Sequence, residues 1–302
     1  MFPIIPANSV TAASGNQEGI FGYGTTGSVT GVTNLVSNAG VVATDVAGVG
    51  TARYAVAACE YGEDKGIFGF GFVSGRLSMT NLVSNAGVVA TDTAGVGYGR
   101  MYPAACEYGG DKGIFGFGNN GSYYSMTNLV SNAGVVATDT AGVGTARNQL
   151  AACEYGGDKG IFGFGYSGGG YANALNMTNL VSNTGVVATD TAGVGTARVG
   201  PAACAYGGDK GIFGYGVTGG GYVSLTNLVS NAGVVATDTA GVGTGRYAAA
   251  ACEYGQDKGI FGYGENGGHS SLTNLVSNVG VVATDTAGVG TARVGVGACS
   301  FN

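Results

Sequence analysis

Six aspartates and six arginines recur at one spacing, and they are the first residues in this sequence whose types could do chemistry. Each aspartate precedes an arginine by eight residues. The six pairs are Asp45 and Arg53, Asp92 and Arg100, Asp139 and Arg147, Asp190 and Arg198, Asp238 and Arg246, and Asp285 and Arg293. Such a set could form a ring of ionic sites for a metal ion or an anionic ligand, or one structural contact per repeat. Because a group that appears six times at one structural position more often serves architecture, we expect the structural contact.

Six cysteines follow the same period, at intervals of 47 to 51 residues. They are Cys59, Cys106, Cys153, Cys204, Cys252 and Cys299. They lack the CxxC or Cys/His clustering of zinc sites. Equivalent positions on neighbouring inner strands would be about 8–10 Å apart, beyond the roughly 7 Å between Cα atoms that a disulfide can bridge. We therefore predict small buried residues between repeats, and no metal site.

Catalytic constellations are hard to assemble from the remaining residues. The chain has a single histidine, and no glycine-rich stretch is followed by a helix that could hold a phosphate. Carboxylate pairs stay open at this level. We predict no enzyme activity and no cofactor. The net charge of −6 with no basic run argues against nucleic acid as a partner, and no apolar stretch approaches membrane-spanning length.

The period itself predicts the elements that must position these residues. One repeat reads as four strands, at 57–61, 66–71, 78–84 and 88–96, joined by short turns. The chain starts at the second strand of a repeat and ends on a first strand, so its last segment should pair with the first repeat. These features predict an all-β, six-bladed β-propeller of four-stranded antiparallel blades, closed by the C-terminal strand.

The predicted domain organisation follows from this division. Residues 1–16 form an N-terminal arm, and residues 17–302 form the propeller. Blade 1 combines 17–51 with 294–302, and blades 2 to 6 span about 54–98, 101–145, 148–196, 199–244 and 247–292.

Three repeated phrases carry a resemblance to known proteins: "DKGIFGYG", "TNLVSNAGVVATDTAGVGTAR" and "AACEYG". The strand order, the glycine ending the second strand and the arginine before the first strand are similar to kelch-like propellers of the galactose oxidase class. The chain departs from that class because Gly-Phe/Tyr-Gly replaces the paired glycines and tryptophan is absent. With one histidine, the copper site of those oxidases cannot be assembled.

More specifically, the phrases resemble repeats of propeller-like proteins encoded by tailed bacteriophages and some bacteria. The N-terminus lacks a charged region followed by a long apolar region, so it does not read as a secretory signal. The resemblance thus implies a virion protein, made in the host cytoplasm and released without a signal peptide.

The copies differ in only two of their connections. The turns at 61–66 and 84–87 barely change between repeats, whereas the loops at 72–78 and 100–104 differ every time. In an antiparallel blade the two turns lie on one face and the two loops on the opposite face. One face is therefore constant and the other is varied. The varied face can be a recognition surface rich in Tyr, Asn, Ser and Gly, or the product of unrestrained drift.

The recognition hypothesis predicts ligand-binding residues on the varied face. They are Phe72, Arg76, Tyr98, Tyr102, Asn119, Tyr123, Tyr124, Tyr166, Tyr171, Asn173, Tyr222, Tyr247, Glu265 and His269.

The leading functional hypothesis is a non-catalytic, tail- or fibre-associated phage protein that binds a host-surface glycan or receptor through this face. Its partners would be other virion proteins and the host surface, and homo-oligomerisation stays open. The alternative is a structural decoration or collar subunit that docks through the constant face or the arm Met1–Gly15. A polysaccharide hydrolase would need a unique carboxylate cluster on one face, for which Glu265 alone is poor support.

Overall fold

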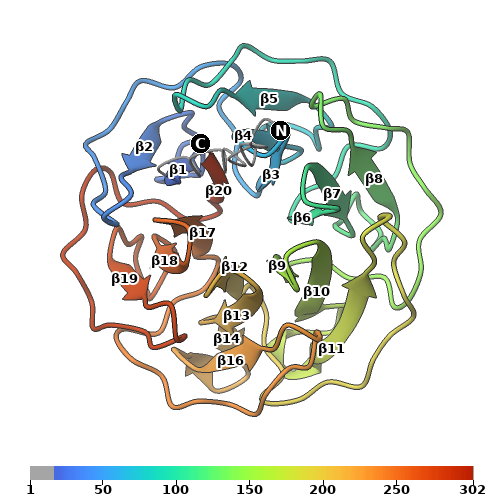
Figure 1. The fold of residues 1–302 in the computed structure, drawn as a ribbon, viewed down its shortest axis with the longest axis vertical. Helices are drawn as coiled ribbons and strands as arrows, with labels where there is room; N and C mark the ends of the chain where they lie inside the picture. Colours follow the sequence, from blue (N-terminus) through green and yellow to red (C-terminus); the bar gives the residue numbers. More distant parts are fainter. Residues whose placement is uncertain (1–16, 302) are drawn as a thin grey trace, which may run out of the picture.

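The chain folds into six small antiparallel sheets of three strands each (Figure 1). The computed structural model describes residues 17–301, so the predicted N-terminal arm lies outside the described residues. The all-β class is confirmed. Within the described range, helix is limited to the 3-10 turn η1 (Tyr171–Asn173), and no helix there is long and apolar enough to cross a membrane.

Each sheet has an inner, a middle and an outer strand. The inner strands are β20 (Gly297–Phe301), β3 (Ala57–Tyr61), β6 (Ala104–Tyr108), β9 (Ala151–Tyr155), β12 (Ala202–Tyr206) and β17 (Ala250–Tyr254). The middle strands are β1 (Glu18–Gly22), β4 (Lys65–Gly69), β7 (Lys112–Gly116), β10 (Lys159–Tyr166), β13 (Lys210–Gly214) and β18 (Lys258–Gly262). The outer strands are β2 (Thr33–Val36), β5 (Thr80–Val83), β8 (Thr127–Val130), β11 (Ala174–Val181), β16 (Thr226–Val229) and β19 (Thr273–Val276). We number the sheets 1 to 6 in this order.

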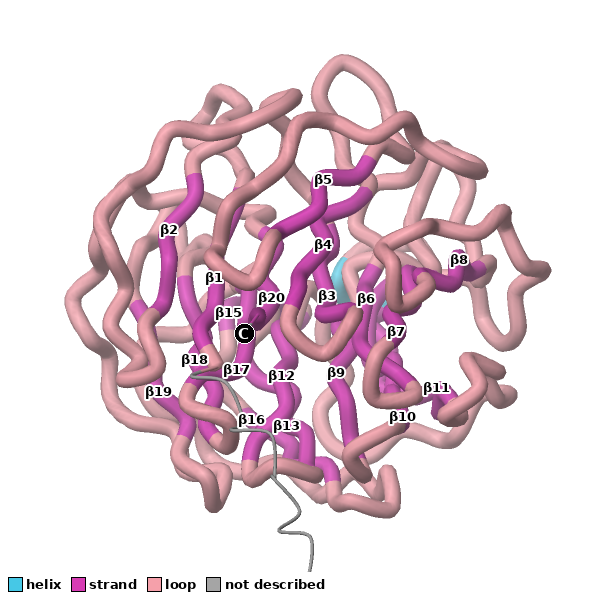
Figure 2. Tube along the Cα trace, turned by 45° about the horizontal axis from the view of Figure 1, so that its top comes forward, coloured by secondary structure: helices cyan, strands magenta, loops and turns pink. Residues whose placement is uncertain are grey.

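The six sheets stand around a common axis, with loops and turns forming the periphery (Figure 2). Inner strands of neighbouring sheets contact one another in a closed circuit, from β20 through β3, β6, β9, β12 and β17 back to β20. The last strand pairs with the first as predicted, because β20 lies antiparallel to β1 with Cys299 opposite Ile20. In sheet 5 the extra hairpin β14 (Val217–Thr218) and β15 (Gly221–Tyr222) occupies the loop after the middle strand.

The prediction of four-stranded sheets is wrong in its fourth strand. The segment 88–96 makes only two isolated bridges to β5, Val83 with Val89 and Thr80 with Thr93. Three residue steps on β5 thus oppose four on the partner, so one residue must bulge out. The side chain of Asn81 fills the gap by donating from Nδ2 to the carbonyl oxygen of Ala90 at 3.0 Å. The same bridge pattern recurs in the other repeats.

Neighbouring sheets interlock through glycines on the middle strand. At the junction of sheets 3 and 4, a Cβ on Gly160 would lie 2.5 Å from Cys106 Sγ, and a Cβ on Gly116 would lie 2.7 Å from Phe162 Cζ. The cysteine therefore packs forward onto the next sheet, and the phenylalanine packs back onto the previous one. All six cysteines are buried and free, as predicted, and the same contacts occur at every junction. Glycine is needed here because any larger residue would hold the sheets apart.

An arginine is buried at every junction, stacked on an aromatic ring. Its Cζ lies 4.0 to 4.5 Å from the centroid of a tyrosine or phenylalanine of the preceding sheet. Between sheets 3 and 4 that ring is Phe117, which has φ 64° and is followed by Gly118 with φ 104°. Two successive left-handed residues end the middle strand earlier than the sequence predicts, at Gly116 in this sheet.

Hydrogen bonds fix the guanidinium from the following sheet. Arg147 donates from Nε to the carbonyl oxygen of Phe164 at 2.9 Å and from Nη2 to Asn179 Oδ1 at 2.6 Å. Asn179 in turn donates from Nδ2 to Asp190 Oδ1 at 2.9 Å, and Thr145 donates its hydroxyl to Asp190 Oδ2 at 2.7 Å. Burial alone would raise the pKa of Asp190, but these hydrogen bonds and the Arg147 charge lower it below its usual value.

The recurring aspartates and arginines thus make a structural contact once per repeat, as expected. Each arginine pairs with the aspartate of the following repeat and not with the one eight residues before it. The six pairs are Arg53 with Asp92, Arg100 with Asp139, Arg147 with Asp190, Arg198 with Asp238, Arg246 with Asp285, and Arg293 with Asp45. The last pair joins the segment before β20 to the first repeat of the described residues.

Gly160→Ala is expected to lower the free energy of unfolding by about 1–3 kcal/mol, since its methyl group would clash with Cys106 Sγ. Gly268→Ala is the control, because no atom lies within 4 Å of a Cβ at that position. Urea denaturation measures both. Adding Cys106→Ala to Gly160→Ala should recover part of the loss. Equal stability of Gly160→Ala and Gly268→Ala would contradict the close approach of Cys106 Sγ to Gly160.

Arg147→Met is expected to lower the free energy of unfolding by about 3–5 kcal/mol, because Asn179 Oδ1 and Asp190 lose their buried cationic partner. Arg76→Met, at an exposed loop position, is the matched control and should change stability little. Thermal unfolding monitored by circular dichroism compares them. A wild-type melting temperature for Arg147→Met would show that the guanidinium does not hold the junction.

Candidate functional site

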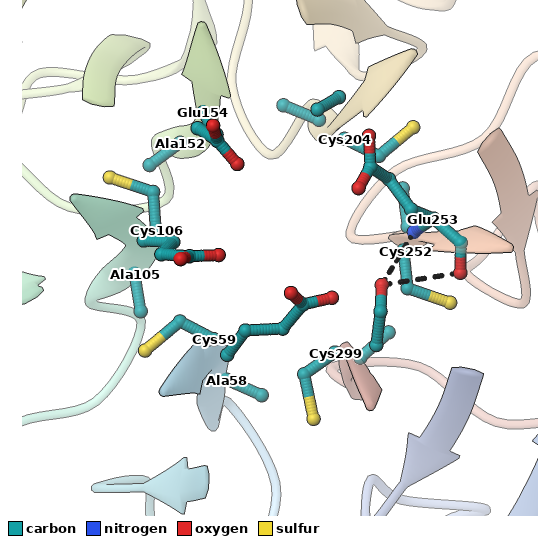
Figure 3. Close-up of a pocket in the computed structure, with 17 residues that line it drawn as sticks. Ala58, Cys59, Ala105, Cys106, Ala152, Glu154, Cys204, Cys252, Glu253 and Cys299 are labelled. Carbon is teal, nitrogen blue, oxygen red and sulfur yellow. Dashed lines mark hydrogen bonds between the residues drawn. The ribbon is translucent and has the colours of Figure 1, made fainter. Parts of the chain in front are cut away.

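The inner strands place alternate side chains on the central axis. In β3 the first, third and fifth residues are buried against neighbouring sheets, whereas Ala58 and Glu60 are half-buried. Figure 3 shows the cysteine sulfurs directed away from the centre and the carboxylates of Glu154 and Glu253 directed towards it. The alternation follows from the strand period of two residues. Each inner strand therefore contributes one residue after its cysteine to a common ring.

Four of the six positions in this ring are glutamates. They are Glu60, Glu107, Glu154 and Glu253, with Ala205 and Ser300 at the other two. Every ion pair in residues 17–301 joins an arginine or lysine to an aspartate, so no cation of this range is paired with these carboxylates. We call these four residues the glutamate ring.

The surroundings of the glutamate ring favour the protonated form. Burial, together with the charges of Glu60 and Asp158, raises the pKa of Glu154 to about 7. Burial and the charges of Glu60 and Glu154 raise the pKa of Glu107 to about 10. The pKa of Glu253 is raised for the same reasons. Neutral carboxyl groups can donate as well as accept hydrogen bonds, so the ring can share protons around the axis.

Two neutral side chains complete the hydrogen bonding of the ring. Gln17 donates from Nε2 to Glu253 Oε2 at 3.1 Å and to Glu60 Oε1 at 3.4 Å. Ser300 Oγ accepts from the backbone N–H of Glu253 at 2.9 Å. Gln17 therefore joins sheet 1 to its two neighbours, sheets 2 and 6.

The space inside the glutamate ring limits its chemistry. The cavity that it lines has a volume of about 70 Å³, whereas sites for small organic ligands are roughly 300–1,000 Å³. A sugar ring therefore does not fit between the carboxylates. Within residues 17–301, no group of three Asp, Glu, His or Cys side chains is placed to hold a metal ion. Sequence reasoning missed this ring, although its signal was the glutamate after four of the six cysteines.

The opposite mouth of the axis is built from backbone. The residue two positions before the start of each inner strand has a positive φ. These residues are Ala55, Tyr102, Gln149, Gly200, Ala248 and Gly295. Their N–H groups donate to the equivalent carbonyl oxygen of the preceding sheet at 2.8 to 3.2 Å in five of the six steps. These residues surround a cavity of about 70 Å³ lined by alanine, valine, proline, leucine, Tyr102 and Gln149. We call this circle the backbone ring.

The two varied connections meet on the face that carries the backbone ring. The isolated bridges Tyr54 with Phe72, Met101 with Asn119 and Tyr247 with Glu265 each join the two varied connections of one repeat. The two constant turns meet on the other side, where Asn85 donates to Asp64 Oδ2 at 3.2 Å. The predicted separation of a constant and a varied face is therefore observed. We call these the turn face and the loop face.

The structure brings the predicted site residues together in several groups. Tyr54 contacts Phe72 at 5.7 Å and Tyr102 at 6.2 Å between ring centroids, and Arg76 lies over Phe72. Tyr123 contacts Tyr166 at 5.8 Å, and Tyr98 stacks on Tyr124 at 6.3 Å.

A further group surrounds Tyr247. The Tyr171 ring lies 6.2 Å from the Tyr247 ring, and Gln149 donates from Nε2 to the Tyr247 hydroxyl at 2.6 Å. Glu265 is the backbone bridge partner of Tyr247, and its Oε1 accepts from the Tyr222 hydroxyl at 3.2 Å. The loops of sheets 4, 5 and 6 thus converge beside the backbone ring.

Four predicted residues differ in the solvent exposure of their side chains. Asn119 and Tyr247 are buried, unlike exposed recognition side chains, and Asn119 Oδ1 accepts from the N–H of Gly121 at 3.0 Å. Asn173 and His269 are exposed, and Asn173 donates from Nδ2 to the carbonyl oxygen of Gly169 at 3.2 Å. Asn119 therefore shapes its own loop, because its side chain is committed there.

The free energy of unfolding is expected to fall as pH rises from about 5 to 10, because Glu154 and Glu107 bind protons more tightly in the folded state than in the unfolded chain. Glu154→Ala, which copies Ala205, should make the fall shallower. Glu63→Gln removes an exposed carboxylate, copies the equivalent Gln256, and should leave the slope unchanged. Urea denaturation at several pH values tests this; parallel curves for wild type and Glu154→Ala would contradict it.

The geometry of the two faces is the basis on which a function must be inferred. No protein-family model matches the sequence, and no curated protein matches it either.

Proposed function

We propose that the chain is a six-bladed β-propeller of kelch-like type that binds a ligand without catalysis through its loop face. Each three-stranded sheet, with its irregular fourth segment, would be one blade. The closed circuit of inner strands and the pairing of β20 with β1 support this interpretation. The repeated phrases that resemble those of tailed phages support a place on a virion, where a tail or fibre would present this face to the host.

One observation carries the binding proposal: single-copy aromatic side chains gather on the loop face and not on the turn face. Tyr98, Tyr171 and Tyr222 are 41 to 61% exposed there. Tyrosine offers a large contact area for little loss of side-chain entropy, and it stacks on sugar rings. A host-surface glycan or a receptor is therefore the ligand that fits this face.

A binding role also agrees with the narrow axis. The glutamate ring brings four carboxyl groups together, but a sugar ring does not fit its cavity of about 70 Å³. On the loop face Tyr222 is hydrogen-bonded to Glu265, and no second carboxylate among residues 17–301 shares this contact. Neither region supplies the pair of carboxyl groups flanking a substrate that glycoside hydrolysis uses.

The turn face favours a second candidate function, a structural subunit of the virion. One valine of each constant turn is 64 to 66% exposed: Val41, Val88, Val135, Val186, Val234 and Val281. A circle of six equal apolar contacts suits docking on another virion protein with repeated geometry. In that case the loop face would be free to vary because nothing binds it.

A loop variant in which Tyr98, Tyr171 and Tyr222 are exchanged together for serine is expected to abolish binding to bacterial cells while the protein stays folded. These three side chains are exposed, so the exchange keeps the backbone bridges of the loops, such as that of Met101 with Asn119. Glu63→Gln on the turn face is the control and should bind as wild type.

The measurement is saturable binding to a panel of intact bacterial cells and to an array of their surface glycans. Saturable binding by the wild type and Glu63→Gln, lost in the loop variant, would support the loop-face proposal. Binding unaffected by the exchange, or no binding by the folded wild type, would contradict it and favour the structural subunit.

A further inference from the structure

Four tyrosines and one carboxylate converge on the loop face from four different sheets. They are Tyr102, Tyr171, Tyr222, Tyr247 and Glu265. Tyr102 precedes β6, Tyr171 begins η1 in the loop after β10, and Tyr222 ends β15. None of these residues is repeated at the equivalent position of all the other sheets, so the group exists once per molecule. We call it the tyrosine cluster.

The members of the tyrosine cluster contact one another directly. Tyr247 is buried and forms its floor, because Gln149 binds its hydroxyl and its ring packs on Gly200. Tyr171 is 46% exposed and lies 6.2 Å from the Tyr247 ring centroid. Tyr222 is 41% exposed and donates its hydroxyl to Glu265. One exposed ring thus contacts the buried ring, and the other is hydrogen-bonded to the carboxylate.

The carboxylate of the tyrosine cluster lacks a counter-charge. All ion pairs within residues 17–301 use aspartates, so Glu265 is in none of them. Arg76, the arginine of the loop face, lies 5.9 Å over the Phe72 ring in sheet 2. His269 is the backbone bridge partner of Glu265 across its own loop and is exposed. The tyrosine faces add further negative potential to that of the carboxylate.

We propose that the tyrosine cluster binds a cationic ammonium group carried by a surface glycan, either a protonated amino sugar or a choline substituent. This inference rests on the proposed function and names the ligand class for the loop face. A cation is attracted both by the faces of Tyr171 and Tyr222 and by Glu265. An anionic sugar would be repelled by the same groups, and a neutral sugar would gain no charge interaction from Glu265.

The proposal is tested by titrating the full-length protein with choline chloride and with 3,3-dimethylbutan-1-ol, its uncharged isostere, at constant ionic strength. Chemical shifts of the tyrosine rings in NMR spectra report binding. Choline is expected to bind at least roughly tenfold more tightly than the alcohol, because only the charge differs. Glucosamine and N-acetylglucosamine form the second pair, and a preference within it distinguishes an amino sugar from a choline substituent as the source.

Three variants locate the site. Glu265→Gln keeps the shape of the side chain but removes its charge, and Tyr171→Ala removes an exposed ring; each should weaken cation binding roughly tenfold. Glu63→Gln removes one carboxylate from the turn face and should bind as wild type. Equal affinity for the charged and uncharged members of both pairs, or unchanged binding in Glu265→Gln, would overturn the proposal.

Its failure can be told apart from failure of the proposed function. Loss of cell binding on loop exchange, with no binding of choline or glucosamine, would leave loop-face recognition standing and refute the cationic ligand. Cation binding by a protein that binds no cells would establish the site and refute the proposed attachment role.

Discussion

A buried guanidinium at each junction between sheets is the interaction on which the rest of the structure depends. Because Arg147 is buried, its charge must be stabilised by protein groups. They are the aromatic ring on which it stacks, the carbonyl and amide oxygens that accept its hydrogen bonds, and the carboxylate with which it forms an ion pair. Phe117, Phe164, Asn179, Asp190 and Thr145 supply these groups from two adjacent sheets. A buried charge without partners costs several kcal/mol, so removing one of these groups is expected to destabilise the junction. The stacked ring and the ion pair recur at all six junctions. The bond from Nε to a carbonyl oxygen is made by Arg53, Arg147 and Arg293, whereas Nε and Nη2 of Arg198 have no partner.

The packing of the middle strands sets how those junctions add up. A cysteine enters the next sheet at one glycine, and a phenylalanine enters the previous sheet at another. Because the same two contacts occur at all six junctions, each sheet is related to its neighbour in the same way. The last junction, where Arg293 meets Asp45 and β20 pairs with β1, is held by the same contacts as the others. Gln17, which occurs once, adds side-chain hydrogen bonds from sheet 1 to sheets 2 and 6.

Prediction from the sequence succeeded where one repeat contains the whole pattern. The all-β class, the bounds of β3, the buried cysteines and the two kinds of face could all be predicted from spacing and variation. The pairing of each arginine could not, because its aspartate lies in the following repeat, and sequence distance hides that contact. The fourth strand was overestimated because the insertion of Asn81 into the ladder depends on a bulge that β-propensity does not reveal. The glutamate ring was missed because its alternation with cysteine has a meaning only once β3 is known to face an axis.

The backbone ring explains how a scaffold so constrained can present a varied face. The five hydrogen bonds that join its six positions use only N–H and carbonyl groups, so these positions can hold alanine, glycine, tyrosine or glutamine. The left-handed conformation of Tyr102 costs on the order of 1–2 kcal/mol relative to glycine, and the ring on both sides supports that cost. On the loop face, the side chains at these positions can therefore change while the backbone hydrogen bonds are kept. Each arginine of the network lies two residues before a position of the backbone ring. Residues after the arginine, such as Tyr102 and Tyr247, are outside that network. They can therefore differ between sheets and form a group that occurs once.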